Sequence, residues 1–334
     1  MRAIQLTSAS VDAFRPVVLP DPEPAAGEVL VRLRAATLNF VDLAVATGGF
    51  PVPAFPLIPV ADGAGEVAAI GAGVADFRVG DRVIPHFLPY WQGGPVTPAH
   101  VSAMRGVSLP GSLAEYVVVP GESLVRLPSH LDFVQGAALP IAGTAAWNAL
   151  TSARVRPGST VVLLGTGGVS LMALQLAKAA GATVIVTSSS DEKLERVRGF
   201  GADHTVNYRA TPEWDAEVLK LTDGRGADLV LETVGEATFA RSLKAAAFGG
   251  TVFTIGFVSG ATPSTNLLPI IVKELKIVGN NTGSIADLAD AMRAIAAHRI
   301  VPMIGRTFGM NEARAAYSEL AADSRSFGKI AIVQ

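Results

Sequence analysis

The stretch VVLLGTGGVSLMALQLAKAAGA, residues 161–182, decides the fold of this 334-residue chain. An apolar run leads into a glycine-rich turn, and an alanine-rich segment with helical periodicity follows. Gly165 permits the tight turn, Gly167 leaves room for a phosphate beside the backbone, and the helix start offers N–H groups to negative charge. The third small residue is Ser170 rather than glycine. The stretch predicts a dinucleotide-binding turn, although such a turn also accepts a flavin or S-adenosylmethionine.

On both sides of this turn the sequence alternates between strands and helices. The expected strands are residues 160–164, 183–187, 204–208, 228–234, 251–256 and 276–279. The expected helices are residues 169–180, 191–200, 213–222 and 236–248. Because each connecting helix has to cover a face of the sheet, we expect an α/β fold with a Rossmann-type, doubly wound parallel sheet.

The two ends of the chain have a different character. Residues 1–125 contain short alternating runs separated by Gly and Pro turns, which predicts a compact β-rich domain. Residues 86–111 have no clear period and are predicted to form a long excursion of the functional or mobile kind. The tail is expected to hold two helices and a last strand, residues 329–333, that returns to the first domain. The predicted domains are residues 1–128, 129–283 and 284–334, the last completing the first.

The composition argues against several classes of protein. The 27 basic and 29 acidic residues give a net charge of −2, too balanced to favour nucleic acid or an anionic membrane. Two uncharged runs, residues 133–153 and 157–177, are long enough to span a bilayer, but Pro and Gly residues interrupt both. The first ten residues lack the apolar core of a signal peptide. With no cysteine there is no disulfide, Cys nucleophile or thiolate–zinc site, and we expect a cytoplasmic location.

The end of the second expected strand indicates which dinucleotide binds. A carboxylate there would bond the ribose hydroxyls of NAD, whereas this chain has Val-Thr-Ser-Ser-Ser at residues 186–190. Ser190 is the predicted N-cap of the next helix, with Asp191 and Glu192 in its first turn. The groups that suit a 2′-phosphate are Ser188, Ser189, Lys193 and Tyr208. We expect NADP(H), with NAD(H) as the alternative if Lys193 is only a solvated surface residue.

Seven short motifs, in this order and spacing, resemble those of the medium-chain dehydrogenase/reductase family. They are TLNFVD (37–42), DGAGEV (62–67), VGDRV (79–83), GTAAW (143–147), GTGGVS (165–170), GAD (201–203) and FGK (327–329). The resemblance covers essentially the whole chain and is closest to the zinc-independent branch, with NADPH:quinone oxidoreductases and NAD(P)-dependent alcohol dehydrogenases. It implies a GroES-like catalytic domain from both chain ends, a Rossmann domain between them, an active site in the cleft, and an oligomer that we expect to be a homodimer.

The resemblance also indicates where zinc-dependent members hold their metal. In register with their ligands, this chain has Asn39, Ala61 and Pro140. An amide, a methyl group and a proline do not make a zinc site, so we expect no metal. Another group must then stabilise charge on the substrate oxygen or supply a proton, while the nicotinamide carries the hydride.

Few residues are candidates for this role. Asn39 is predicted to donate an amide N–H to a carbonyl, and Asp42 or Asp62 to relay a proton. Each also has a structural interpretation, in which the side chain holds a turn or bonds backbone N–H groups. Thr144 resembles a family threonine that lies close to the nicotinamide ring.

Aromatic residues suggest the rest of the substrate site. Phe50 stands where related quinone oxidoreductases have a tyrosine, so Tyr90 and His86 are further candidates for an acid, although packing or surface roles are commoner for such residues. An apolar pocket suited to a small apolar or aromatic substrate is expected from Phe50, Phe55, Tyr90, Trp91 and Phe257.

The remaining coenzyme contacts follow the ends of the later strands, where ligands of such sheets bind. The resemblance implies backbone contacts to the carboxamide there and a return of the FGK motif to the coenzyme. The predicted coenzyme-binding residues are Thr144, Gly165, Thr166, Gly167, Gly168, Val169, Ser188, Ser189, Lys193, Tyr208, Val234, Gly256, Phe257, Asn281, Phe327 and Lys329.

The expected function is a zinc-independent NAD(P)H-dependent oxidoreductase. Alcohol/ketone conversion and reduction of a quinone or activated alkene both remain open, although the missing metal argues against easy alcohol oxidation. The alternative from another class is an NADPH-binding protein of low turnover, either crystallin-like or redox-sensing.

Overall fold

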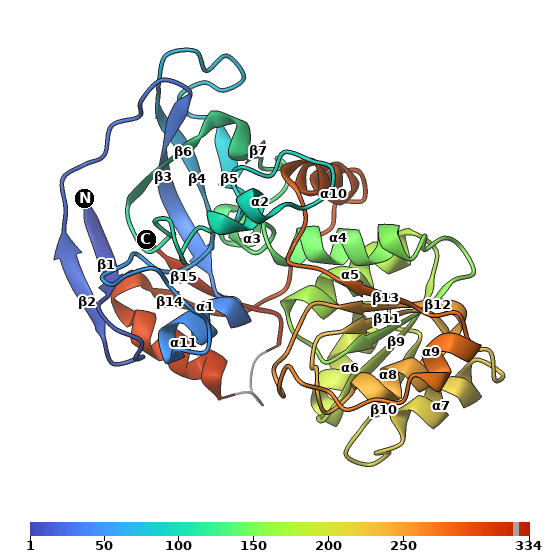
Figure 1. Cartoon of the computed structure of the whole chain (residues 1–334). Helices are drawn as coiled ribbons and strands as arrows, with labels where there is room; N and C mark the ends of the chain where they lie inside the picture. The colour runs from blue at the N-terminus through green and yellow to red at the C-terminus, as the bar shows by residue number, and fades with distance from the viewer. Residues whose placement is uncertain (323–326) are drawn as a thin grey trace. The chain divides into compact units, whose positions relative to one another are not determined.

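The structure is a computed structural model that describes residues 1–322 and 327–334 (Figure 1). The chain divides into two compact units. We call residues 145–283 the central unit, and residues 1–144 with 284–334 the terminal unit. Both ends of the chain thus contribute to one unit, and each unit has its own sheet.

The central unit contains a six-stranded, wholly parallel sheet in the order β10-β9-β8-β11-β12-β13. Its strands are β8 (Thr160–Leu164), β9 (Thr183–Ser188), β10 (His204–Asn207), β11 (Ala227–Glu232), β12 (Ala246–Thr254) and β13 (Lys276–Gly279). In chain order this is 3-2-1-4-5-6, the Rossmann arrangement, in which the strand order reverses between β8 and β11. The expected α/β fold with a doubly wound parallel sheet is confirmed.

Residue type explains why these segments are strands. Every residue of β8 is buried, as are the five residues of β9 that follow Thr183. Near-continuous Val, Ile and Leu runs are typical of strands covered on both faces. On one face, Val162, Ile185 and Val230 pack with Trp214 and Leu243 from the covering helices. The helices of this unit are α5 (Gly168–Ala179), α6 (Asp191–Gly199), α7 (Trp214–Leu221), α8 (Phe239–Ala245) and α9 (Leu268–Val272), and α4 (Ala142–Ser152) begins in the terminal unit.

The terminal unit is built on a seven-stranded sheet in the order β14-β15-β3-β4-β5-β7, with β6 pairing β3, and on a separate β1-β2 pair. The strands are β1 (Arg2–Leu6), β2 (Phe14–Val18), β3 (Glu28–Thr37), β4 (Asp62–Ile70), β5 (Arg82–Pro85), β6 (Tyr116–Pro120), β7 (Leu124–Arg126), β14 (Ile304–Gly309) and β15 (Lys329–Val333). The helices are α1 (Phe40–Thr47), α2 (Pro98–Ser102), α3 (Phe133–Ala137), α10 (Ile285–Ala297) and α11 (Ala313–Ala321), with 3-10 turns at Gly121–Ser123 and Met310–Glu312. The last strand, β15, lies between β14 and β3.

The structure differs from the expected elements at several places. The helix expected at residues 236–248 is shorter, because residues 233–238 form a loop and β12 already begins at Ala246. The excursion at residues 86–111 is anchored in the core, since Phe87, Leu88 and Trp91 are buried and α2 lies within it. The largely exposed β14 was not expected, because the tail was predicted to hold two helices and only one strand.

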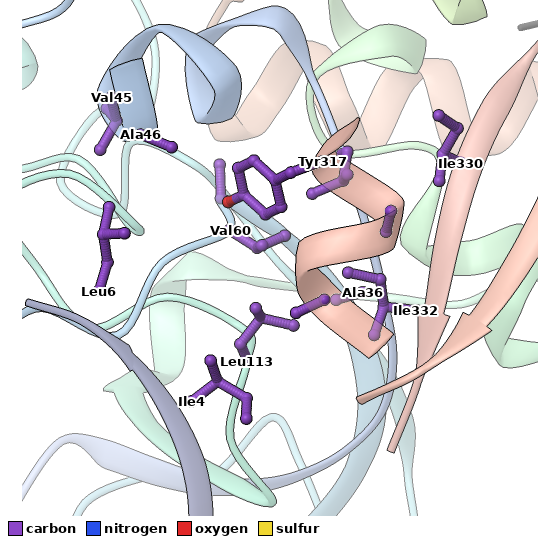
Figure 2. Packing of buried hydrophobic residues seen from close by; sticks show 14 of the residues in the cluster. Ile4, Leu6, Ala36, Val45, Ala46, Val60, Leu113, Tyr317, Ile330 and Ile332 are labelled. Atoms are coloured by element: carbon purple, nitrogen blue, oxygen red, sulfur yellow. The ribbon is translucent and has the colours of Figure 1, made fainter. Parts of the chain in front are cut away.

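The main core of the terminal unit joins elements from both chain ends (Figure 2). Tyr317 of α11 lies among Leu6, Val60 and Ile332, and its ring is fully buried. Within the described ranges 1–322 and 327–334, no helix combines the length and the apolar character needed to cross a membrane.

Candidate active site

Three neighbouring segments of the terminal unit bring three polar side chains together. In the sheet, Thr37 at the end of β3 pairs with Asp62 at the start of β4 on one side and with Ala331 of β15 on the other. Asn39 follows Thr37 by two residues and is the N-cap of α1, and Lys329 precedes Ala331 by two residues. Strand register therefore places Asn39, Asp62 and Lys329 at one end of three adjacent strands.

The side chains of these three residues form a hydrogen-bonded cluster. Lys329 Nζ donates to Asn39 Oδ1 at 2.6 Å and lies 3.3 Å from Asp62 Oδ2. Asn39 Nδ2 donates to the same Asp62 oxygen at 2.9 Å. The ammonium and the carboxylate thus fix which end of the Asn39 amide points which way. We call Asn39, Asp62 and Lys329 the lysine cluster.

One hydrogen of Asn39 Nδ2 is left over in this arrangement. An amide nitrogen carries two hydrogens, and Asp62 accepts one of them. Among the described residues, no protein acceptor is bonded to the second hydrogen. Asn39 is only half-buried, whereas Asp62 and Lys329 are buried. The second N–H is the group of this cluster best suited to meet a substrate oxygen.

Asp42 supports the cluster from the first turn of α1. Its two carboxylate oxygens accept the backbone N–H groups of Asn39 at 2.7 Å and Ala61 at 2.9 Å. It therefore performs the structural role that its sequence position left open, and a catalytic role stays a prediction. Burial raises the pKa of Asp42 to about 6, against the opposing effect of those backbone hydrogen bonds.

Burial acts on both members of the ion pair. It raises the pKa of Asp62, and the Lys329 charge and hydrogen bonds from Asn39, Lys329 and Ile141 oppose this. Burial lowers the pKa of Lys329, and the charges of Asp62 and Asp42 oppose this. Each charge is thus costly to bury alone and depends on the other to remain ionised.

The other catalytic candidates lie outside this cluster. Thr144 is buried and its Oγ1 donates to the Pro140 carbonyl at 2.6 Å. Tyr90 is 50% exposed, and His86 is buried against the backbone of Leu88, where burial lowers the pKa of His86 to about 4. No hydrogen bond or ion pair in the described part of the chain joins Tyr90 or His86 to the lysine cluster.

The sequence did not single out Arg105, which the excursion places beside the cluster. Its side chain is 1% exposed, one guanidinium nitrogen donates to Ser112 Oγ at 2.9 Å, and the Asp62 charge acts on it electrostatically. Gly106 makes this approach possible, because a Cβ there would lie 2.7 Å from the backbone nitrogen of Ala61. A lone arginine in an otherwise uncharged stretch was the only signal.

In the central unit, the glycine turn lies between β8 and α5, as expected. Gly165 has φ +76°, which favours glycine on conformational grounds. Gly167 is the N-cap of α5 with φ −78°, and a Cβ built on it would meet no protein atom within 4 Å. Backbone conformation and packing thus do not require glycine at Gly167; its N-cap position favours a small residue, and the open space is compatible with the predicted phosphate. Ser170 is buried and donates to the Leu164 carbonyl at 2.8 Å, which locks helix to strand.

The end of β9 has the polar character that the sequence predicted. Ser190 caps α6 by accepting the backbone N–H of Lys193 at 3.3 Å, which confirms its expected role. Ser188 is buried, and its carbonyl accepts the N–H of Tyr208 from the end of β10 at 3.0 Å. These bonds place the backbone of Ser188 beside that of Tyr208 at the carboxyl ends of β9 and β10, with Ser189 and Lys193 close by in the chain. Binding of a 2′-phosphate by these residues stays a prediction.

Glu232, which was not predicted, organises the ends of the later strands. It is fully buried as the last residue of β11. Its carboxylate accepts N–H groups of Val234 and Gly235 at 2.8 and 2.9 Å, and the hydroxyls of Thr238 and Ser242. A charged residue that ends an apolar strand could have signalled this role. The remaining predicted contacts of this unit, Val234, Gly256, Phe257 and Asn281, follow β11, β12 and β13.

The last two predicted coenzyme residues, Phe327 and Lys329, lie in the terminal unit. Phe327 is 2% exposed, and the Lys329 ammonium is bonded within the lysine cluster. Coenzyme contact by either residue stays a prediction.

Comparison with known proteins agrees with this architecture. Residues 25–129 match the alcohol dehydrogenase GroES-like domain, and residues 168–297 match the family described as zinc-binding dehydrogenase. A zinc-type alcohol dehydrogenase-like protein of Schizosaccharomyces pombe is 41% identical over 92% of this chain and 90% of its own. A quinone oxidoreductase of Pseudomonas aeruginosa is 35% identical (90% and 89% covered), and an acryloyl-coenzyme A reductase of Metallosphaera sedula is 30% identical (93% of each).

Solved structures show the same fold. An NAD-dependent alcohol dehydrogenase superposes with a TM-score of 0.90 at 34% identity, covering 100% of both chains. A mycobacterial protein solved with NADPH has a TM-score of 0.84 at 26% identity, again covering 100% of both. The chain belongs to the medium-chain dehydrogenase/reductase family. Within that family it is an NAD(P)-dependent oxidoreductase.

The description of the second matching family implies a zinc ion, which needs imidazole, thiolate or carboxylate ligands. The positions in register with the zinc ligands are Asn39, Ala61 and Pro140, and only Asn39 has a polar side chain. Its amide oxygen already accepts a hydrogen bond from the Lys329 ammonium. In residues 1–322 and 327–334 no group of three or more His, Cys, Asp or Glu side chains is arranged to hold a metal ion. The residues at this site do not fit a catalytic zinc.

Proposed function

We propose that the protein is a zinc-independent, NADP(H)-preferring reductase of small apolar or aromatic enones or quinones. The observation that carries this proposal is the open space at Gly167, beside the point where the strand order reverses, which would admit a ligand phosphate. The hydroxyls and amine at Ser188, Lys193 and Tyr208 support the 2′-phosphate of NADP(H). A cytoplasmic location is part of the proposal and rests on the absence of cysteine.

The polar groups of the terminal unit favour conjugate reduction over alcohol oxidation. When bound, the coenzyme supplies a hydride to the substrate. The chain then has to stabilise negative charge on the substrate oxygen, and Asn39 Nδ2–H is the proposed donor. A single amide donor suits a charge that conjugation spreads over several atoms, whereas an alkoxide normally requires a metal. Carbonyl reduction is the second proposed reaction of the same site.

The first experiment measures coenzyme oxidation. The purified protein is incubated with NADPH or NADH and a panel of enones, quinones, aldehydes and ketones, and nicotinamide absorbance is followed. We expect turnover of an enone or quinone, with higher kcat/KM for NADPH than for NADH. Asn39→Ala should lower kcat by about 100-fold, the usual loss for one oxyanion donor, and leave NADPH affinity unchanged.

The exposed Asn311→Ala variant is the matched control and should behave like the wild type. Tight NADPH binding without oxidation by any member of the panel would instead favour the binding protein of low turnover. Wild-type kcat in Asn39→Ala would remove Asn39 from the mechanism.

We also propose a homodimer, formed through one edge of the central sheet. β13 is the last strand of that sheet, and α9, which precedes β13 in the chain, carries apolar side chains that are largely exposed in the single chain. They are Leu268, Ile271 and Val272, with Leu267 next to the helix and Ile277 on the strand. A second copy that pairs with this edge would cover both the free backbone groups and the apolar side chains.

A further inference from the structure

The lysine cluster has the geometry of a small cation site that the chain itself fills. One amide oxygen, Asn39 Oδ1, and one carboxylate oxygen, Asp62 Oδ2, converge on the Lys329 ammonium at 2.6 and 3.3 Å. Carbonyl and carboxylate oxygens are the usual ligands of hard cations in proteins. The Lys329 side chain is 5% exposed and that of Asp62 is 0% exposed, so the two charges interact where little water is present.

This arrangement excludes a second cation. A divalent ion bound to either oxygen would lie a few ångströms from the ammonium, and repulsion between like charges is strong where water is scarce. Arg105, also buried, adds a further positive charge near Asp62. The charged groups around the ammonium are thus Asp62, Asp42 and Arg105, which with Lys329 balance to zero.

We propose that the Lys329 ammonium is the built-in cation of this active site and the positioning residue for the Asn39 amide. By donating to Oδ1, it holds the amide with its nitrogen toward Asp62 and its second N–H available to a substrate oxygen. The positioning role rests on the proposed function, whereas the cation site itself does not.

Loss of the ammonium has two consequences. Without the Lys329 donor to Oδ1, the Asn39 amide can adopt both flipped orientations. In some molecules the substrate oxygen would then face Asn39 Oδ1, which cannot donate a hydrogen bond. Asp62 loses its ion-pair partner, and because burial raises its pKa, it takes up a proton more readily. We therefore expect lower kcat with unchanged coenzyme affinity, together with an empty site that accepts a small ammonium ion.

The experiment is chemical rescue of Lys329→Ala. With an enone or quinone substrate, kcat should fall by about 100-fold, and propylammonium should restore at least a tenth of the loss, whereas propanol should not. Lys244→Ala, which removes an exposed lysine, is the matched control and should be insensitive to the amine. Wild-type kcat in Lys329→Ala, or a folded variant that no amine rescues, would overturn the positioning role.

A readout without turnover separates this inference from the proposed function. Propylammonium should raise the Tm of Lys329→Ala, and it should not raise the Tm of the wild type or of Lys329→Ala/Asp62→Asn. Absence of that shift would refute the cation site, even if the wild type is an active reductase. Stoichiometric zinc in the purified wild type would refute it as well. A shift without any panel turnover would keep the cation site and reject the proposed function.

If Lys329→Ala does not fold, two other variants test whether a positive charge is required at this position. Lys329→Arg keeps the charge and Lys329→Gln keeps a donor without charge. Lys329→Arg should retain more stability and a higher kcat than Lys329→Gln. Equal behaviour of the two variants would contradict a requirement for a cation.

Discussion

At the scale of single residues, burial of the Asp42 carboxylate makes the stability of the fold depend on pH. Its oxygens hold the backbone at Asn39 and Ala61, while Asp62, Lys329 and Tyr317 from β4, β15 and α11 are the titratable groups that act on it. Its pKa of about 6 exceeds the ordinary value of 3.8. The folded state therefore binds the proton more tightly than the unfolded state.

The stability that the protonated Asp42 contributes is lost as pH rises from about 4 to about 6, and the shift corresponds to about 3 kcal/mol. Asp42→Asn cannot ionise, so its free energy of unfolding should gain about 2 kcal/mol relative to the wild type between pH 4 and pH 7. The lost backbone hydrogen bond adds an offset that is independent of pH. Urea unfolding at both pH values measures the difference.

Asp76→Asn, at an exposed position, is the control and should follow the wild type at each pH. Parallel pH curves for Asp42→Asn and the wild type would show that the Asp42 carboxyl titrates normally.

At the scale of elements, the β8–α5 turn separates two reasons for glycine. Gly165 is required by its positive φ, whereas Gly167 is required only if something occupies the space beside it. Gly167→Ala should therefore fold, with a loss of at most about 1 kcal/mol from the poorer N-cap. Its affinity for NADPH should fall by at least about 10-fold, because the methyl group takes space from the phosphate. Calorimetric titration with NADPH measures the change.

Gly199→Ala in α6 is the matched control, since a Cβ there also meets no protein atom within 4 Å. It should bind NADPH like the wild type. Unchanged NADPH affinity in Gly167→Ala would contradict the proposed coenzyme position.

At the scale of the whole molecule, the proposed second copy covers α9 and the β13 edge. Ile271 is 67% exposed in the single chain. Ile271→Glu would place a charge in an apolar interface without a partner, which is costly to desolvate. We expect the variant to elute as a monomer with an unchanged fold, measured by light scattering on a size-exclusion column and by circular dichroism.

Val301→Glu, at an apolar position of similar kind on the terminal unit, is the control and should leave the dimer intact. A wild type that is monomeric at all concentrations, or a dimer that persists in Ile271→Glu, would reject this interface.

The sequence by itself determined the class of fold and the positions of the coenzyme turn and the α6 cap. These depend on local information: a strand buried on both faces is a continuous apolar run, and a helix start needs a small residue or a capping hydroxyl. Asn39 and Asp62 were also candidates from their motifs alone. The expected helix at residues 236–248 was too long, because propensity did not reveal the buried Glu232 that holds residues 233–238 as a loop.

Only the tertiary structure decided what surrounds those candidates. Lys329 Nζ meets Asn39 Oδ1 across 290 positions of the chain, and no local pattern encodes the strand register that brings them together. Resemblance associated Lys329 with the coenzyme, while the structure bonds its ammonium to Asn39 and Asp62. Arg105 likewise becomes a buried charge only because the excursion folds against residues 59–61. Burial and pairing of charge depend on every element that excludes water from them, so they arise only when the whole unit is assembled.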